Sequence, residues 1–114
     1  MLFKENRLKK TKDFENVFKN GKGYKEDFLY LKILKNDLKN SRFGFVVGKN
    51  FSKKAVLRNK MRRKLRELVK NNISQIDTSI DGILMVRPAS QLADFKSLDK
   101  KIENLFKKSG VIKK

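Results

Sequence analysis

Several residue types that usually carry catalysis or covalent stabilisation are missing from this chain. Its 114 residues include no cysteine, no histidine and no tryptophan, and only one proline. Without cysteine, disulfides and thiolate zinc sites are excluded. Without histidine, no side chain has an ordinary pKa between pH 5 and 8. Ser-His-Asp chemistry, Cys-His chemistry and histidine-ligated metals are therefore excluded as well.

The remaining acid–base candidates are carboxylates, and none of them forms a convincing catalytic pair. Asp99 and Glu103 share a helix face four residues apart, but lysines surround them, which is typical of a solvated, salt-bridged surface. The other neighbouring carboxylates fall in expected turns: Glu26, Asp27, Asp77 and Asp81. We therefore expect no catalytic side chains in this chain, so that any chemistry is supplied by another molecule.

Long hydrophobic runs are also absent. No stretch of 18 apolar residues occurs, so no segment is expected to span a membrane. The basic N-terminus, residues 1–12, lacks the apolar core and small-residue cleavage site of a signal peptide. We expect a cytoplasmic protein with a single domain over residues 1–114.

What the sequence does have is positive charge. Thirty Lys and Arg against twelve Asp and Glu leave a net charge of +18. Such a surplus repels itself, and a chain tolerates it most easily when its partner is a polyanion. Nucleic acid is the first candidate and an anionic membrane surface is the second.

Apolar periodicity predicts helices and strands in an alternating order. A basic arm over 1–11 comes first, Thr11 is expected as an N-cap, and Gly21 and Gly110 as residues that end helices. Gly21 to Asp27 is expected to be a turn region. The expected helices cover 12–20, 54 or 55–72, and 92 or 94–109, and the expected strands cover 28–34, 42–48 and 82–87. The prediction is an α+β sandwich with three helices on a sheet of about four strands, in which 28–34 and 42–48 form an antiparallel hairpin.

The faces of these elements follow from their periods of 3.6 and 2 residues. Small residues on one face of strand 42–48, Gly44, Val46 and Gly48, leave room for a helix or an RNA strand to approach. The opposite face is expected in the core: Phe43, Phe45 and Val47. The side chains of strand 28–34 alternate between two faces. One face carries Phe28, Tyr30, Lys32 and Leu34, and the other carries Leu29, Leu31 and Ile33. The last helix carries an apolar stripe of Phe95, Leu98, Ile102, Leu105 and Phe106.

The helix from residue 54 or 55 to 72 has an unusual charge. Nine cations between Lys53 and Lys70, against Glu67 alone, leave a local net charge of +8. On a helical wheel the apolar stripe is narrow, within about 80°, and consists of Leu57, Met61, Leu65 and Leu68. A flank beside it carries Arg58, Arg62 and Arg66 at four-residue spacing, with Asn59 and Arg63 next to them.

This helix is predicted to bind nucleic acid. Like charges four residues apart destabilise an isolated helix, so a merely solvated face would mix signs. Residues four apart rise about 6 Å, close to the spacing of phosphates along a strand, and arginine binds phosphate through two parallel hydrogen bonds. A membrane-surface helix would have a wider apolar face.

Aromatic side chains beside a basic surface are typical of single-stranded RNA binding, because bases stack on them. Phe43, Phe45, Phe95 and Phe106 are expected in the core. For Phe14, Phe18 and Tyr30 the sequence leaves both roles open, core packing or base stacking.

The stretch Ala55–Glu67 fits the pattern A-x-x-R-N-x-x-[KR]-R-x-x-R-[EQ] at every fixed position. This pattern resembles the signature of the protein subunit of bacterial ribonuclease P. Other segments resemble the same family: Asn6-Arg7-Leu8, Asp13-Phe14, Val17-Phe18, Arg42 to Gly48 as R-x-G-x-x-V, Arg87-Pro88-Ala89 and Leu105-Phe106.

The resemblance implies a fold with a left-handed βαβ crossover, against the usual right-handed rule. It implies a subunit of an endoribonuclease whose catalyst is a large RNA, which removes the 5′ leader of precursor tRNA using Mg²⁺. The protein itself is expected to bind no cofactor and to need no protein partner. It would bind the catalytic RNA and the leader.

The residues expected to bind RNA fall into three groups. The helix group consists of Lys53, Lys54, Arg58, Asn59, Arg62, Arg63 and Arg66, and the arm group of Arg7, Lys9 and Lys10. The expected leader cleft consists of Phe14, Phe18 and Tyr30, although the register of strand 28–34 leaves open whether Tyr30 or Leu29 and Leu31 face it. The alternative to the ribonuclease P reading is a structural RNA-binding protein of the ribosomal type.

Overall fold

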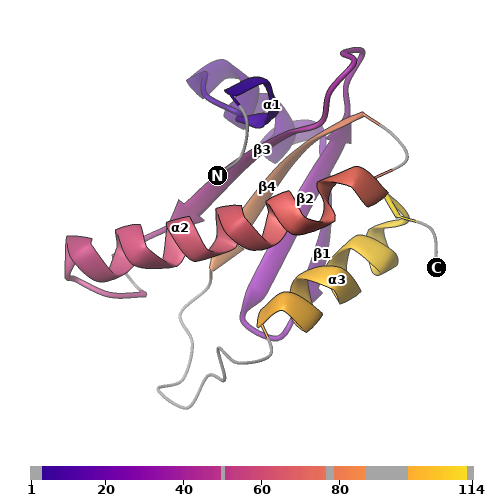
Figure 1. The fold of residues 1–114 in the computed structure, drawn as a ribbon. Coiled ribbons are helices and arrows are strands. Elements are labelled where there is room, and N and C mark those ends of the chain that lie inside the picture. The colour runs from indigo at the N-terminus through magenta and orange to yellow at the C-terminus, as the bar shows by residue number, and fades with distance from the viewer. Residues whose placement is uncertain (1–3, 50, 77–78, 87–97, 113–114) are drawn as a thin grey trace.

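The computed structural model describes residues 4–49, 51–76, 79–86 and 98–112, and it places a four-stranded sheet between helices (Figure 1). The helical elements are η1 (Lys4–Asn6), α1 (Thr11–Asn20), α2 (Ala55–Asn72), η2 (Ile73–Gln75) and α3 (Leu98–Ser109). The strands are β1 (Lys22–Glu26), β2 (Leu29–Lys35), β3 (Arg42–Val47) and β4 (Ile80–Val86). The predicted α+β class and the limits of the long helix are confirmed.

The strand order is β1-β2-β4-β3, so the predicted hairpin between β2 and β3 is wrong. Both strands pair with β4, β2 antiparallel and β3 parallel. β4 takes the central position because its residues are mostly apolar and six of the seven are buried. The segment β3–α2–β4 is therefore a parallel crossover between neighbouring strands. Its left-handedness stays a prediction.

The region expected as a turn, Gly21 to Asp27, contains a strand instead. β1 pairs antiparallel with β2, and the connection between them includes Asp27 at a φ of 57°. β1 is an edge strand with mostly exposed side chains, two of them lysines. Charged residues are common on edge strands because they discourage pairing with another chain. Without an apolar alternation, the sequence pattern did not reveal this strand.

The main core lies between one face of the sheet and the helices α2 and α3 (Figure 1). The predicted stripe of α3 is confirmed for its described members, since Leu98, Ile102, Leu105 and Phe106 are all buried. Phe95, the expected start of this helix at 92 or 94, Asp77 and the segment Arg87-Pro88-Ala89 lie outside the described residues. Gly110 ends α3 with a φ of 78°, as expected for a glycine after a helix.

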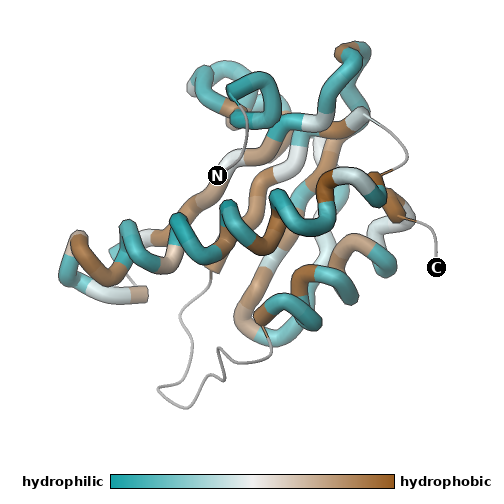
Figure 2. Tube along the Cα trace, in the orientation of Figure 1, coloured by the Kyte–Doolittle hydropathy of each residue, from teal (hydrophilic) through white to brown (hydrophobic). Residues whose placement is uncertain are grey.

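The predicted apolar stripe of α2 needs correction at its first member. Met61 and Leu65 are buried and Leu68 packs against the core, but Leu57 is 44% exposed and Val69 is buried instead. The reason is visible in Figure 1, where the first turns of α2 extend past the end of the sheet. The same end of α2 carries hydrophobic colour in Figure 2, beyond the end of the sheet.

A second, smaller apolar cluster lies on the opposite face of the sheet, under α1. Leu8, Val17 and Ile83 are buried there, with Phe14 packed beside them. A side chain on Gly44 would collide with the Phe14 ring, so the glycine lets α1 approach β3 closely, as the small face of this strand predicted. Gly21 ends α1 in an extended conformation (φ −79°, ψ 162°), and Lys10 rather than Thr11 is its cap residue.

The expected extended arm is docked rather than free over its described part. The Leu8 amide donates a hydrogen bond to the Phe43 carbonyl at 2.9 Å, and the Asn6 side chain donates to the Ser41 carbonyl at 2.8 Å. Arg7 forms a parallel bridge with Phe43. The segment before α1 therefore covers the outer edge of β3, which would otherwise be unpaired.

A network of charged side chains holds α1 to the sheet. Arg42 donates to both carboxylate oxygens of Asp81, at 2.9 and 2.6 Å, and also lies 3.3 Å from the Asp13 carboxylate of α1. Asp81 was expected in an exposed turn, but it lies in β4 and is 5% exposed. The hydrogen bonds from Arg42 to Asp81 raise the pKa of Arg42. The Arg42–Asp81 pair is bidentate, which is the geometry in which arginine binds carboxylate most strongly.

We predict that Asp81→Asn lowers the free energy of unfolding by about 2 kcal/mol, because the buried partner of Arg42 loses its charge. Chemical denaturation monitored by circular dichroism measures this change. Glu103→Gln is the matched control, since Glu103 pairs with Lys107 on a far more exposed surface, and its effect should be much smaller. Equal effects of the two substitutions would contradict the structural role of the Arg42 network.

A second prediction concerns acid. Lys108 donates a hydrogen bond to Glu26 and lowers its pKa below the ordinary value of 4.5, with a further contribution from Asn104 and an opposing one from burial. A lowered folded-state pKa adds stability above pH 4.5, which is lost as the pH falls through the folded value. The stability difference between the wild type and Glu26→Gln should therefore be constant above pH 5 and shrink below 4.5.

Denaturation at a series of pH values measures this difference. Lys108→Met is the control, because it removes the same contact between α3 and β1 from the other side. It should reduce the pH dependence as Glu26→Gln does, and the two changes together should add little. A difference that stays constant down to pH 3 would contradict the pairing.

Candidate RNA-binding surface

The helix α2 carries its arginine ladder, Arg58, Arg62 and Arg66, on the flank that faces β3 and the loop before the helix. Arg58 donates to the carbonyls of Ser52 and Lys53, both at 2.9 Å. Arg62 donates to the Val47 carbonyl at 3.5 Å and to the Asn59 side chain. The Arg66 guanidinium lies 6.0 Å from the centre of the Phe45 ring, within reach of a cation–π contact. The three side chains are thus half-buried and held in fixed orientations.

The other predicted residues of this helix group are exposed: Lys53, Lys54, Asn59 and Arg63. The first turn of α2 contains no acidic residue, and no side chain caps it. Cations at the positive end of a helix macrodipole are unfavourable, and an anion there relieves the repulsion. The positive charge at the first turn of α2 therefore favours binding of a negatively charged partner.

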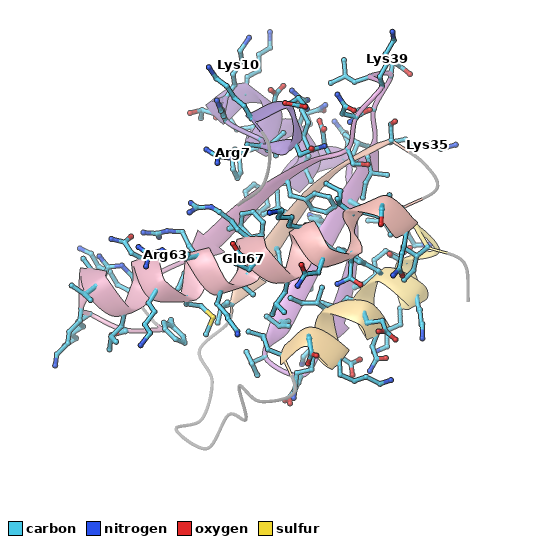
Figure 3. All side chains as sticks on the ribbon, in the orientation of Figure 1. Arg7, Lys10, Lys35, Lys39, Arg63 and Glu67 are labelled. Atoms are coloured by element: carbon cyan, nitrogen blue, oxygen red, sulfur yellow. The ribbon has the colours of Figure 1, made fainter. Side chains whose placement is uncertain are left out.

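The structure brings one of the three predicted arm residues to this helix. Burial lowers the pKa of Arg66, and the nearby charges of Arg7, Arg62 and Arg63 lower it further. Figure 3 shows Arg7 on the side of the N-terminal segment that faces α2, opposite Arg63 and Glu67. Lys10 lies at the far side of α1 from α2 in the same view, and Lys9 is exposed beside it in the sequence. Arg7 thus extends the ladder, whereas Lys10 does not.

A groove opens on the other face of the sheet, beside α1. It has a volume of about 340 Å³ and is lined by Phe18, Tyr30, Lys32 and Met85. Phe18 is 40% exposed, and the Lys32 ammonium donates a hydrogen bond to the Phe18 carbonyl. A side chain on Gly23 would collide with the Tyr30 hydroxyl, so this glycine keeps room for the tyrosine.

Two of the three expected cleft residues line this groove. Phe18 and Tyr30 do, but Phe14 packs over Gly44 in the small apolar cluster. The open question about strand β2 is resolved, because Leu29 and Leu31 are fully buried in the main core. Lys32 and Met85 were not predicted. Lys32 shares the face of Tyr30 by the two-residue period, but Met85 lies opposite Tyr30 only through the β2–β4 register.

Comparison with known proteins agrees with this geometry. The family model of ribonuclease P matches residues 2–110. The ribonuclease P protein component of Clostridioides difficile is 39% identical over 105 residues, which cover 91% of each chain. The solved structure of the Staphylococcus aureus RNase P protein superposes with a TM-score of 0.84 at 28% identity, covering 95% of this chain and 98% of that one. The RNase P protein from Thermotoga maritima gives a TM-score of 0.78 at 32% identity, covering 90% and 96%.

This chain belongs to the ribonuclease P protein family.

As a ribonuclease P protein, the chain is a subunit of an endoribonuclease that works together with RNA in the maturation of the tRNA 5′ end. The family assignment decides against the alternative of a ribosomal-type structural protein. Within the ranges that the structure describes, no helix is long and apolar enough to cross a membrane. Because ribonuclease P proteins work together with RNA, RNA is the partner that the basic surface of this chain fits.

The exposed Arg63 and the half-buried Arg62 of α2 are expected to respond differently to substitution. Arg63→Ala should weaken binding to the ribonuclease P RNA of the same organism and lower the slope of log affinity against log salt by about one. It should leave the unfolding transition unchanged, because Arg63 is exposed. Arg62→Ala should weaken RNA binding and also lower stability, because its contact with the Val47 carbonyl is lost.

Filter binding at a series of salt concentrations and thermal unfolding measure the two effects. Lys39→Ala is the matched control, since this lysine lies in the loop between β2 and β3, away from α2 (Figure 3). An unchanged salt slope for Arg63→Ala, or the same loss for Lys39→Ala, would contradict a specific role of α2.

Proposed function

We propose that α2 binds the catalytic RNA of ribonuclease P while the groove beside α1 holds the 5′ leader of precursor tRNA. The observation that carries this proposal is the placement of the two surfaces on opposite faces of one sheet. The arginine ladder packs along the α2 side of β3, whereas Phe18 and Tyr30 line the groove on the α1 side. A single sheet can thereby bind two RNA segments, one on each side, without competition between them.

The groove has the chemistry that a single strand needs. Phe18 and Tyr30 offer aromatic surfaces to unstacked bases, and Met85 adds an apolar floor. Lys32 supplies a cation at the same place, suited to a backbone phosphate. Stacking on aromatic rings tolerates any base, so the groove should accept leaders of different sequence.

The RNA carries the chemistry in this proposal, and Mg²⁺ serves the RNA. The chain has no histidine, and Asp81, the buried carboxylate of the part of the chain that the structure describes, is bound by Arg42. The protein side chains bind and position. Arg58, Arg62 and Arg66 are already oriented by contacts with the protein, so little side-chain freedom is lost when phosphates bind them. Such preorganisation lowers the entropic cost of binding RNA.

Phe18→Ala tests the groove. Removal of one stacking surface should weaken the binding of precursor tRNA to the assembled ribonuclease P by about tenfold. The loss should be large with a long leader and much smaller with a leader of one nucleotide, which offers fewer bases for stacking. Equilibrium binding to the holoenzyme measures both substrates. Leu38→Ala is the control, because Leu38 is 49% exposed but lies in the loop between β2 and β3.

Two outcomes would contradict the proposal. An equal loss with both leaders would place Phe18 against the tRNA body or the catalytic RNA. No loss with either leader, from a holoenzyme that assembles normally, would show that the groove does not hold the leader.

A further inference from the structure

The first turn of α2 exposes two aliphatic side chains that the fold does not use. Val56 is 75% exposed and Leu57 is 44% exposed. They lie at the end of the helix that extends past the sheet, where Figure 2 shows hydrophobic colour at the free end. Both occupy variable positions of the motif that spans Ala55–Glu67. Exposed apolar residues that adjoin one another often mark an interaction site.

These two side chains lie within a strip of lysines. On a helix, residues three and four apart are neighbours on one face. Lys60 is therefore the neighbour of both Val56 and Leu57. Lys53 lies just before the helix, since α2 begins at Ala55. Lys64 continues the strip by one more turn. All three lysines are exposed, and no acidic residue occurs from Ser52 to Arg66.

The strip is separate from the arginine ladder. The buried side of α2 is marked by Met61, Leu65 and Val69, and the ladder lies next to it. Val56 and Lys60 point away from that side, about half a turn around the helix from Leu65. Leu57 has the helical angle of the buried side but is exposed because it lies beyond the sheet. The ladder's guanidinium groups lie against carbonyls and a ring of the protein itself, whereas the side chains of the strip are exposed.

We propose that this exposed strip, formed by Lys53, Val56, Leu57, Lys60 and Lys64, binds an unpaired nucleobase of the RNA subunit. The base rests on Val56 and Leu57, and the lysines hold the phosphates on either side of it. The inference rests on the proposed binding of α2 to the catalytic RNA and names what that RNA must offer, which is a nucleotide outside a duplex. Bases within a stacked A-form helix do not present their faces to a protein.

The charge of the strip selects this occupant. The partner must be anionic and also have an apolar face, and an unpaired nucleotide has both. A second copy of the chain would bring the same local charge of +8 against this one. An anionic membrane would need a broader apolar face than two side chains provide. RNA is also the molecule with which ribonuclease P proteins work.

The double variant Val56→Ala/Leu57→Ala tests the proposal. Alanine is a better helix former than valine, and both positions are exposed, so the unfolding temperature should not fall. The affinity for the ribonuclease P RNA of the same organism should fall about tenfold, as expected for loss of an apolar contact. The salt slope should stay at the wild-type value, because no phosphate contact is removed.

Chemical footprinting on the same complex gives an independent readout. A base that the wild-type protein protects from dimethyl sulfate or a carbodiimide reagent should become reactive again with the double variant. Leu38→Ala is the matched control, an equally exposed leucine in the loop between β2 and β3, and it should preserve both the affinity and the footprint. Lys60→Ala/Lys64→Ala should lower the salt slope instead.

The outcomes separate this inference from the proposed function. If the double variant binds as tightly as the wild type while Arg63→Ala binds more weakly, α2 contacts the RNA but the apolar pair does not, and the inference is overturned. If no α2 variant affects RNA binding, the proposed function fails as well. Loss of self-association in light scattering, or of binding to phosphatidylserine vesicles, without loss of RNA affinity would assign the strip to another partner and overturn the inference.

Discussion

A surplus of positive charge is the constraint on which this structure depends. With a net charge of +18, the few carboxylates must be placed where they hold the fold together. Asp13 and Asp81 converge on Arg42 and attach α1 to the sheet, and Glu26 pairs with Lys108 where α3 meets β1. The consequence is that α2 keeps nearly all of its cations for an external anion. Structural pairing and RNA binding are thereby divided between different elements.

The two faces of the sheet then acquire different roles. The α2 and α3 side contains the larger apolar core, so α2 is a rigid platform whose arginines are held against β3. The other face is covered only in part, because α1 has ten residues and packs closely through Phe14 on Gly44. What α1 leaves uncovered becomes the groove with Phe18 and Tyr30. The small helix and the glycine thus create a binding surface beside a packed one.

Sequence reasoning succeeded where a pattern is local. The period of α2 predicted its limits, and the motif within it predicted the family. It failed where the structure of a segment depends on pairing with a distant strand. β1 has no apolar alternation and forms because β2 pairs with it. β4 lies between β2 and β3, although their order in the chain suggested a hairpin. Leu57 has the right helical angle for the core but lies beyond the sheet. Met85 entered the groove through strand register, which a single sequence does not specify.

The most direct test of the division between RNA chemistry and protein binding is reconstituted cleavage. The purified protein is combined with the ribonuclease P RNA of the same organism and a precursor tRNA at low Mg²⁺, beside protein alone and RNA alone. The account predicts cleavage at the mature 5′ end only when both are present, and cleavage by RNA alone once Mg²⁺ is raised. Cleavage by the protein alone, or an RNA whose activity the protein leaves unchanged at every Mg²⁺ concentration, would contradict it.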